Sequence, residues 1–349
     1  MSNLTADLVL EGGGVKGIGL VGAVAALQKA GYTFHRVCGT SAGAVMGSLV
    51  AAGLPGHRLR KVALSLDYRK FRDAYPLERM PLLGPGLAML GHDGLYKGDY
   101  ARQWVADQLA ALGVHTFADL RLPGETHLPP DQRYKLVVTV SDVTLGQLVR
   151  LPWDYREVYG LDPDQQLVAD AVRASMSIPF YFAPMSLTNP ATRQRSTLVD
   201  GGLLSNFPID TFDRTDLLAP RWPTFGVQLL PSLPADNAKL FAPLGLPVPG
   251  PLHLLQEVVT TTIVGNDQAS LDKPWVKART IPVDTQAAGF VDFGISGRQE
   301  QALYRQGYSA ATDFLSTWDW PAYLERYRCS PARRNGATRT AHASAPSSV

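Results

Sequence analysis

The sequence has few cysteines, no excess of charge of one sign and no long apolar run that is free of glycine and proline. Among its 349 residues only Cys38 and Cys329 are cysteines, too few for a disulfide framework or a cysteine-based metal site. The net charge is +2, which argues against a nucleic-acid partner. Residues 37–56 carry no charge, but glycines and a proline interrupt them, so we expect buried core here and not a membrane span.

The start of the chain lacks the pattern of a secretory signal. No basic segment followed by a long apolar one is present, and Asp7 and Glu11 come early. We therefore expect a cytoplasmic protein or one that binds a membrane peripherally, with export by a signal-less route left open. No metal-ligand spacing occurs, so no metal and no cofactor are expected.

Gly39-Thr40-Ser41-Ala42-Gly43 has the G-x-S-x-G form of a nucleophile elbow. An apolar-leaning stretch over 34–38 predicts a strand before it, and the small apolar residues 42–52 predict a buried helix after it. Such a turn holds the serine in a strained backbone position that exposes its hydroxyl. The start of the following helix directs free N–H groups at a developing oxyanion. The motif has only three fixed positions, so its significance depends on partners elsewhere.

A glycine-rich loop, Gly12 to Gly17, comes before this motif. It lies between a predicted strand over 7–10 and a predicted helix over 18–30. This strand, loop and helix, followed by a second strand and helix, predict an α/β fold with a mainly parallel sheet. Glycines in such a loop let backbone N–H groups approach an anionic oxygen.

The same loop also fits the dinucleotide fingerprint G-x-G-x-x-G. That fingerprint needs an acidic residue about 20 positions further on, and none occurs between Glu11 and Asp67. Arg36 could instead serve a phosphorylated ribose, so nucleotide binding stays open as an alternative. A P-loop is excluded because no Gly-Lys-Ser/Thr follows the glycines.

Three aspartates are candidates for a catalytic acid or base. Asp200 ends a predicted strand over 196–199 and precedes Gly201 and Gly202. Asp142 follows a predicted strand over 134–140, but we favour a turn-capping role for it. Asp99 is interpreted as the N-cap of a helix over 100–112.

A serine hydrolase with a triad would also need a histidine. No histidine occurs between residues 128 and 252, so none is local to Asp200. His253 could reach the site only through the fold, and His35 lies in the strand that leads to Ser41. The sequence alone leaves the choice between a triad and a dyad open.

Taken together, these motifs give the sequence a family resemblance. The glycine-rich loop, Gly39–Gly43 and Val199–Gly202, in this order, resemble the patatin-like phospholipases, and the runs 174–180 and 206–208 are also similar. The resemblance covers roughly residues 7–317. It implies a three-layer α/β fold with a mostly parallel central sheet and helices on both faces.

The resemblance also implies a chemistry, a Ser-Asp dyad that hydrolyses lipid or phospholipid esters through an acyl-enzyme. The implied catalytic residues are Ser41 and Asp200. The implied oxyanion hole and its support are formed by Gly12, Gly13, Gly14, Ala42, Lys16 and Gly17, and the motif glycines are Gly39, Gly43, Gly201 and Gly202. A non-catalytic lipid-binding module remains an alternative, and an activating protein partner is unknown.

We expect one acyl hydrolase domain over residues 1–325 and a disordered basic tail over 326–349. Further strands are predicted over 225–230 and 280–283, and helices over 168–177 and 298–315. The segments 80–90 and 231–256 are apolar and broken by proline and glycine. They are candidates for a lid or an acyl-chain contact, although packed loops explain them as well.

Overall fold

The structure is a computed structural model. It describes residues 4–73, 94–216, 218–230, 259, 261–262, 271–286 and 295–328. The candidate lid over 80–90, the whole loop over 231–256 and His253 lie outside the described residues, as does the tail from residue 329.

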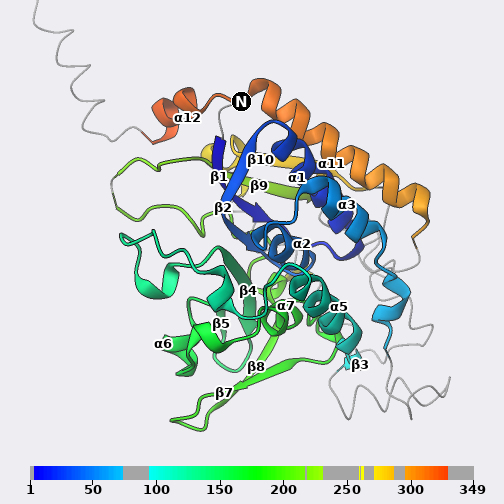
Figure 1. Cartoon of the computed structure of the whole chain (residues 1–349), viewed down its shortest axis with the longest axis vertical. Helices are drawn as coiled ribbons and strands as arrows, with labels where there is room; N and C mark the ends of the chain where they lie inside the picture. The colour runs from blue at the N-terminus through cyan, green and yellow to red at the C-terminus, as the bar shows by residue number, and fades with distance from the viewer. Residues whose placement is uncertain are drawn as a thin grey trace, which may run out of the picture.

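An eight-stranded sheet forms the centre of the described chain (Figure 1). Its order is β10 (Thr280–Asp284), β9 (Thr224–Leu230), β1 (Leu4–Leu10), β2 (Tyr32–Gly39), β4 (Leu136–Asp142), β8 (Arg195–Asp200) and β7 (Met185–Thr188), and β5 (Gln147–Leu151) also pairs with β4. The first five strands run parallel, whereas β5, β7 and β8 are joined by antiparallel pairs. A second, two-stranded sheet pairs β3 (Gly94–Tyr96) with β6 (Phe180–Phe182).

The α-helices of the described residues are α1 (Ile18–Lys29), α2 (Ala42–Ala51), α3 (Gly56–Leu64), α5 (Asp99–Ala110), α6 (Tyr155–Tyr159), α7 (Val168–Ser175), α10 (Pro274–Lys277), α11 (Gly297–Thr317) and α12 (Trp320–Tyr327). The predicted helices are all present, within a few residues of the expected bounds. The predicted N-cap of α5 is wrong: Gly98, with a left-handed φ of 73°, is the cap. Asp99 is the first helical residue, where its negative charge faces the positive end of the helix.

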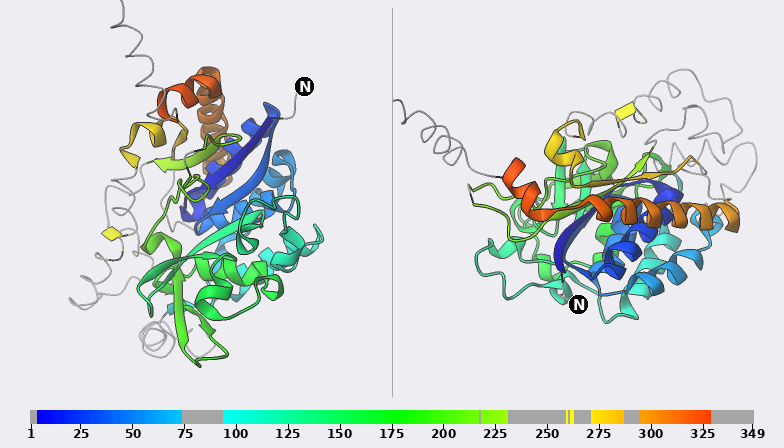
Figure 2. Two further views of the ribbon diagram at one scale, coloured as in Figure 1. Left: turned by 90° about the vertical axis from the view of Figure 1, so that its left-hand side faces the viewer. Right: turned by 90° about the horizontal axis from the view of Figure 1, so that it is seen from above.

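Side chains of β1 alternate between two cores, one on each face of the sheet. Leu8 and Leu10 enter the large core under α1 and α2. Val9 points to the opposite face and packs in a second cluster with Phe207 and with Val276 of α10. Figure 2 shows the sheet edge-on between these layers. The three-layer, mainly parallel α/β architecture expected from the sequence is therefore confirmed.

Helices α1 and α11 cross at glycines. A Cβ at Gly22 would overlap the carbonyl oxygen of Tyr304, and a Cβ at Gly307 would overlap that of Gly19. The two backbones therefore lie closer than side chains would allow. This crossing seats the last long helix against the first one (Figure 1).

Strand β4 brings the ends of two other strands together. Gly39 of β2 lies beside Val138, and Asp200 of β8 lies beside Val140. β5 occupies one edge of β4 from Val138 to Asp142, so β2 and β8 must share the other edge. The parallel β2 and the antiparallel β8 therefore point their carboxyl ends at each other along that edge.

Candidate functional site

Ser41 occupies the turn between β2 and α2 in an unusual backbone conformation. Its φ is 51° and its ψ is −121°, outside the regions that an L-residue with a side chain prefers. A Cβ at Gly39 would overlap the carbonyl oxygen of Gly43, and a Cβ at Gly43 would overlap that of Leu10. The strand and the helix thus approach as closely as the G-x-S-x-G pattern predicts.

A buried serine holds this strained turn in place. The Ser41 backbone N–H donates to Ser175 Oγ at 2.8 Å, and Ser175 Oγ donates to the Thr139 carbonyl at 2.7 Å. Ser175 is the last residue of α7 and is fully buried. The Thr40 and Thr139 hydroxyls, 2.6 Å apart, tie the same turn to β4. Helix α7 and strand β4 together therefore set the position of the Ser41 backbone.

Asp200 lies directly opposite the Ser41 hydroxyl. Ser41 Oγ donates to Asp200 Oδ2 at 2.7 Å, and the Gly202 N–H donates to Oδ1 at 2.8 Å. Both Ser41 and Asp200 are only 3% exposed. Burial raises the pKa of Asp200 to about 7, although the hydrogen bonds from Ser41 and Gly202 act in the opposite direction. A carboxylate of this kind is a far better base near neutral pH than an exposed aspartate.

The glycine-rich loop is anchored by two polar side chains, one from the residue just before it and one from a distant part of the sequence. Gly12 N–H donates to the Asn206 carbonyl at 3.1 Å, and Asn206 Nδ2 donates to the Gly12 carbonyl, also at 3.1 Å. Asn206 Nδ2 lies 3.3 Å from Glu11 Oε1, and the other oxygen of that carboxylate accepts from the Leu229 N–H. Glu11 and Asn206 therefore fix the loop where it leaves β1.

Some backbone N–H groups beside Ser41 make no hydrogen bond to the described protein. Within the described residues, the N–H groups of Gly13 and Gly14 make no hydrogen bond, and the same holds for Ala42, the first residue of α2. Gly14 has a φ of 56°, which favours glycine. A Cβ at Gly17 would lie 3.0 Å from the Ala42 side chain, so the loop packs tightly against the start of α2.

Lys16 is buried beneath the loop, with only 2% of its surface exposed. Burial lowers its pKa, while the carboxylates of Glu11 and Asp284 favour its charged form. Its part in supporting the loop or the charge therefore stays a prediction.

Asp142, the other candidate acid, and His35, a candidate histidine, contact residues other than Ser41 and Asp200. Asp142 is fully buried and accepts from Thr144 N–H at 2.9 Å, Leu145 N–H at 3.0 Å and Tyr159 Oη at 2.9 Å. It caps the turn between β4 and β5, as the sequence favoured. His35 Nε2 lies 2.7 Å from Glu125.

Arg36, which could have served a phosphorylated ribose in the nucleotide-binding alternative, also has partners within the protein. Its guanidinium pairs with Asp7 at 2.5 Å and stacks on Phe212 at 4.5 Å. Where a ribose-binding acid would stand, after β2, the chain instead carries Ser41. In the described part of the chain no group of His, Cys, Asp and Glu could hold a metal ion.

Three residues of this site had no predicted role: Ser175, Glu11 and Asn206. Ser175 and Asn206 lie in the two runs that resembled the family, 174–180 and 206–208, so a sequence signal was present. Glu11 entered the sequence analysis only as an early acidic residue and as the last acid before Asp67. Their functions depend on contacts across more than 130 residues, which no local pattern reveals.

The chain is similar to known proteins. The family model of the patatin-like phospholipases matches residues 8–213, more than half of the chain. This protein belongs to the patatin-like phospholipase family. An uncharacterized protein, YqhO of Bacillus subtilis, is 40% identical over 320 residues, which cover 90% of this chain and 99% of that protein.

A second relative is the 85/88 kDa calcium-independent phospholipase A2 of Mus musculus. It is 27% identical over 208 residues, which cover 58% of this chain but only 22% of that protein. Among solved structures, VipD from Legionella pneumophila matches with a TM-score of 0.50 and 19% identity, over 89% of this chain and 67% of that chain. This likeness supports the same fold. No helix within the described ranges is long and apolar enough to cross a bilayer.

Proposed function

We propose that the protein is a lipid acyl hydrolase that uses Ser41 as nucleophile and Asp200 as its base, without a histidine. Family membership supports hydrolysis of lipid esters in general. The observation that carries the finer proposal is the 2.7 Å hydrogen bond from Ser41 Oγ to the buried Asp200 carboxylate. Of the described histidines, none makes a hydrogen bond to either side chain.

In the first half of the reaction, Ser41 Oγ attacks the ester carbonyl carbon while its proton passes to Asp200. Collapse of the tetrahedral intermediate breaks the bond to the alcohol, which takes the proton from Asp200. In the second half, water attacks the acyl-enzyme and gives its proton to Asp200. That proton returns to Ser41 as the free acid leaves, so both steps balance.

The negative charge on the carbonyl oxygen needs donors that are in place beforehand. We assign this role to the N–H groups of Gly13, Gly14 and Ala42. Gly12 belongs to the same loop, but its N–H already donates to Asn206. Its role in the proposal is therefore to let the loop pass close to Ser41, since a Cβ at Gly12 would lie 3.2 Å from the Ser41 Cβ.

The test compares the wild type, Ser41→Ala and Asp200→Asn on a short-chain chromogenic ester and on phospholipid vesicles. Both substitutions should lower kcat by at least about 10³-fold, because nucleophile and base act as one unit. Circular dichroism checks that the variants are folded, and a fluorophosphonate should label the wild type but not Ser41→Ala.

Hydrolysis retained by folded Ser41→Ala would overturn the proposal. Loss of activity in Ser41→Ala but not in Asp200→Asn would instead indicate a different base. Lipid binding by a wild type that hydrolyses none of the substrates would favour the non-catalytic alternative.

A further inference from the structure

The segment that contains α3 and η2 (Tyr68–Phe71), a short 3-10 helix, carries a large excess of positive charge. Residues 55–72 include six lysines and arginines but a single acid, Asp67, so their net charge is +5. The whole chain has a net charge of only +2, so the rest of it is negative overall. The six cations form what we call the basic face: Arg58, Arg60, Lys61, Arg69, Lys70 and Arg72.

The cations of the basic face are not neutralised by acids of the described chain. All six side chains are exposed, and no ion pair joins any of them to a residue that the structure describes. Asp67 accepts from the Arg69 N–H at 3.2 Å. The next acid, Asp73, accepts from the N–H groups of Gly98 at 2.8 Å and Tyr100 at 2.9 Å. Both neighbouring carboxylates therefore bind backbone, and the positive charge faces solvent.

Two of these cations lie over aromatic rings. The Arg60 guanidinium is 4.6 Å from the centre of the Tyr304 ring, and the Lys70 ammonium is 5.7 Å from that of Tyr100. Such contacts restrict long side chains that would otherwise lose more freedom when they bind a partner. The basic face is thus partly ordered before any partner arrives.

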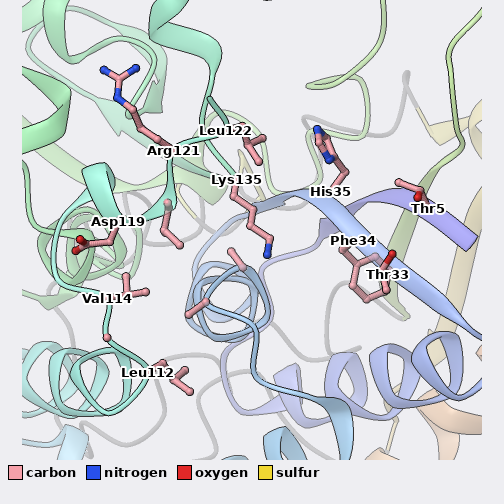
Figure 3. Close-up of a pocket in the computed structure, with 14 residues that line it drawn as sticks. Thr5, Thr33, Phe34, His35, Leu112, Val114, Asp119, Arg121, Leu122 and Lys135 are labelled. Atoms are coloured by element: carbon pink, nitrogen blue, oxygen red, sulfur yellow. The ribbon is translucent and has the colours of Figure 1, made fainter. Parts of the chain in front are cut away.

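The opposite edge of the sheet, where β1 and β2 begin, differs in charge. Figure 3 shows that an acid, Asp119, lies among the cations there. Arg121 pairs with Asp164 at 2.7 Å, and His35 lies 2.7 Å from Glu125. An unbalanced positive surface is therefore a local feature of the segment around α3.

Helix α3 extends this positive charge towards the edge of the sheet that carries Ser41. At its start, a Cβ on Gly56 would lie only 2.7 Å from the Cα of Ala25, near the end of α1. Beyond its end, Leu66 belongs to the same buried cluster as Ile18, the first residue of α1. Helix α3 therefore runs back along α1 towards the glycine-rich loop (Figure 1).

The 3-10 helix η2 is packed on the side of the proposed site. Phe71 is buried in the same cluster as Val15 of the glycine-rich loop and Ile178. Ile178 directly follows Ser177, whose carbonyl accepts the Asp200 N–H at 2.9 Å. The end of the basic face therefore lies on the side of the molecule where the proposed nucleophile and base meet.

We propose that the basic face binds the surface of an anionic lipid bilayer and so brings the proposed site to its substrate. The phosphates of anionic lipids are spread over a plane, where several exposed cations of one protein can meet them together. Family membership supports hydrolysis of lipid esters in general. The choice of a lipid surface among polyanions rests on the proposed function, because such an enzyme meets its substrate there.

The test measures co-sedimentation of the full chain carrying Ser41→Ala, which removes turnover, with vesicles. Binding is expected to vesicles of equal parts phosphatidylcholine and phosphatidylglycerol. It should be at least about tenfold weaker to pure phosphatidylcholine, since each cation near an anionic surface adds to the attraction. Adding Arg58→Gln, Lys61→Gln and Arg69→Gln should weaken binding to the anionic vesicles by at least about tenfold. About 1 M salt, which screens charges beyond about 3 Å, should have the same effect.

The matched control replaces three exposed cations outside the basic face, Arg193→Gln, Arg195→Gln and Lys273→Gln. It changes the net charge by the same amount, so vesicle binding should remain close to that of the parent. Thermal unfolding checks that both triple variants are folded.

Four results would overturn the proposal. They are no binding to the anionic vesicles, equal binding to pure phosphatidylcholine, an equal loss of binding in the control, and equal affinity for single-stranded RNA that depends on the same three cations. The last would show a general polyanion surface and not one for lipid. Ester hydrolysis plays no part in these measurements, so failure here is distinct from failure of the proposed function.

Discussion

At the scale of single residues, the raised pKa of Asp200 predicts how activity depends on pH. The proposed base must be ionised, and burial raises its pKa to about 7. We expect kcat/KM of the wild type to increase with pH up to about 7 and to level off above it, because this parameter reports ionisation in the free enzyme. A profile that is already flat from pH 5 upwards would contradict the assignment.

The same pKa can be tested without turnover. An unfolded aspartate ionises near pH 4, so between about pH 4 and 7 the folded protein binds the additional proton. The stabilising effect of that proton is fully present at low pH and is lost as the pH rises through about 7. The melting temperature of the wild type should therefore fall relative to Asp200→Asn between pH 5 and pH 8.

Ser175 gives a second prediction at this scale. Ser175→Ala removes the acceptor of the strained Ser41 N–H and the donor to the Thr139 carbonyl, leaving two buried polar groups without partners. We expect a loss of about 1–3 kcal/mol in stability and a decrease in kcat of about tenfold or more, with little change in KM.

The matched control is Ser48→Ala. Ser48 is also fully buried, but its hydroxyl only bonds to Val45 within α2. The control should lose some stability and leave kcat unchanged. An equal decrease in kcat in both variants would show that Ser175 has no particular role in placing Ser41.

Both partners of the Ser41–Asp200 contact could be proposed from the sequence, because each residue lies in a recognisable local pattern. The contact itself could not, since it joins residues 159 positions apart. The roles of Ser175, Glu11 and Asn206 were missed for the same physical reason: a buried side chain finds its partner through the fold. The sequence also left the histidine question open, because chain separation does not limit what a fold can bring together.

At the scale of elements, the crossing of α1 and α11 is the most sensitive packing feature. Gly307→Ala should destabilise the protein by about 1–3 kcal/mol, because its Cβ would overlap backbone that can move only if a helix moves. Thermal or urea unfolding measures the change.

Gly297→Ala, in the first turn of the same helix, is the control. A Cβ there meets nothing within 4 Å, so the substitution should be neutral or slightly stabilising. Equal destabilisation by both substitutions would show that the close approach at residue 307 is unimportant.

The sequence predicted most of the parallel strands and main helices well, because each carries its own apolar pattern. It missed α3 and the antiparallel strands β5 and β7. In β5 the buried residues alternate with partly exposed ones, and in β7 no residue is fully buried. Neither strand therefore has a strong apolar pattern. The cap of α5 was misplaced by one residue because an aspartate is a stronger general signal than the left-handed Gly98 that the chain uses.

At the scale of the whole molecule, Asp213 joins three distant parts of the chain. Its carboxylate accepts from Arg279, before β10, at 2.7 Å and from Arg328, after α12, at 2.8 Å. Arg279 is only 3% exposed. Asp213→Asn would leave a buried guanidinium without its countercharge, so we expect a loss of about 3 kcal/mol in stability.

Asp216→Asn is the control for this network. Asp216 pairs with Arg214 on the surface, where an ion pair contributes roughly 0–1 kcal/mol. Chemical unfolding should separate the two variants clearly. Similar losses in both would mean that the Asp213 network adds no more than an exposed pair.

The register of β4 has a consequence for how this chain can vary. Because Gly39 and Asp200 lie beside Val138 and Val140, the spacing of Ser41 and Asp200, the proposed nucleophile and base, is a property of the sheet. Loops that meet the substrate can change in length or composition without disturbing that spacing. Variants with altered loops should therefore keep the hydrogen bond between Ser41 and Asp200.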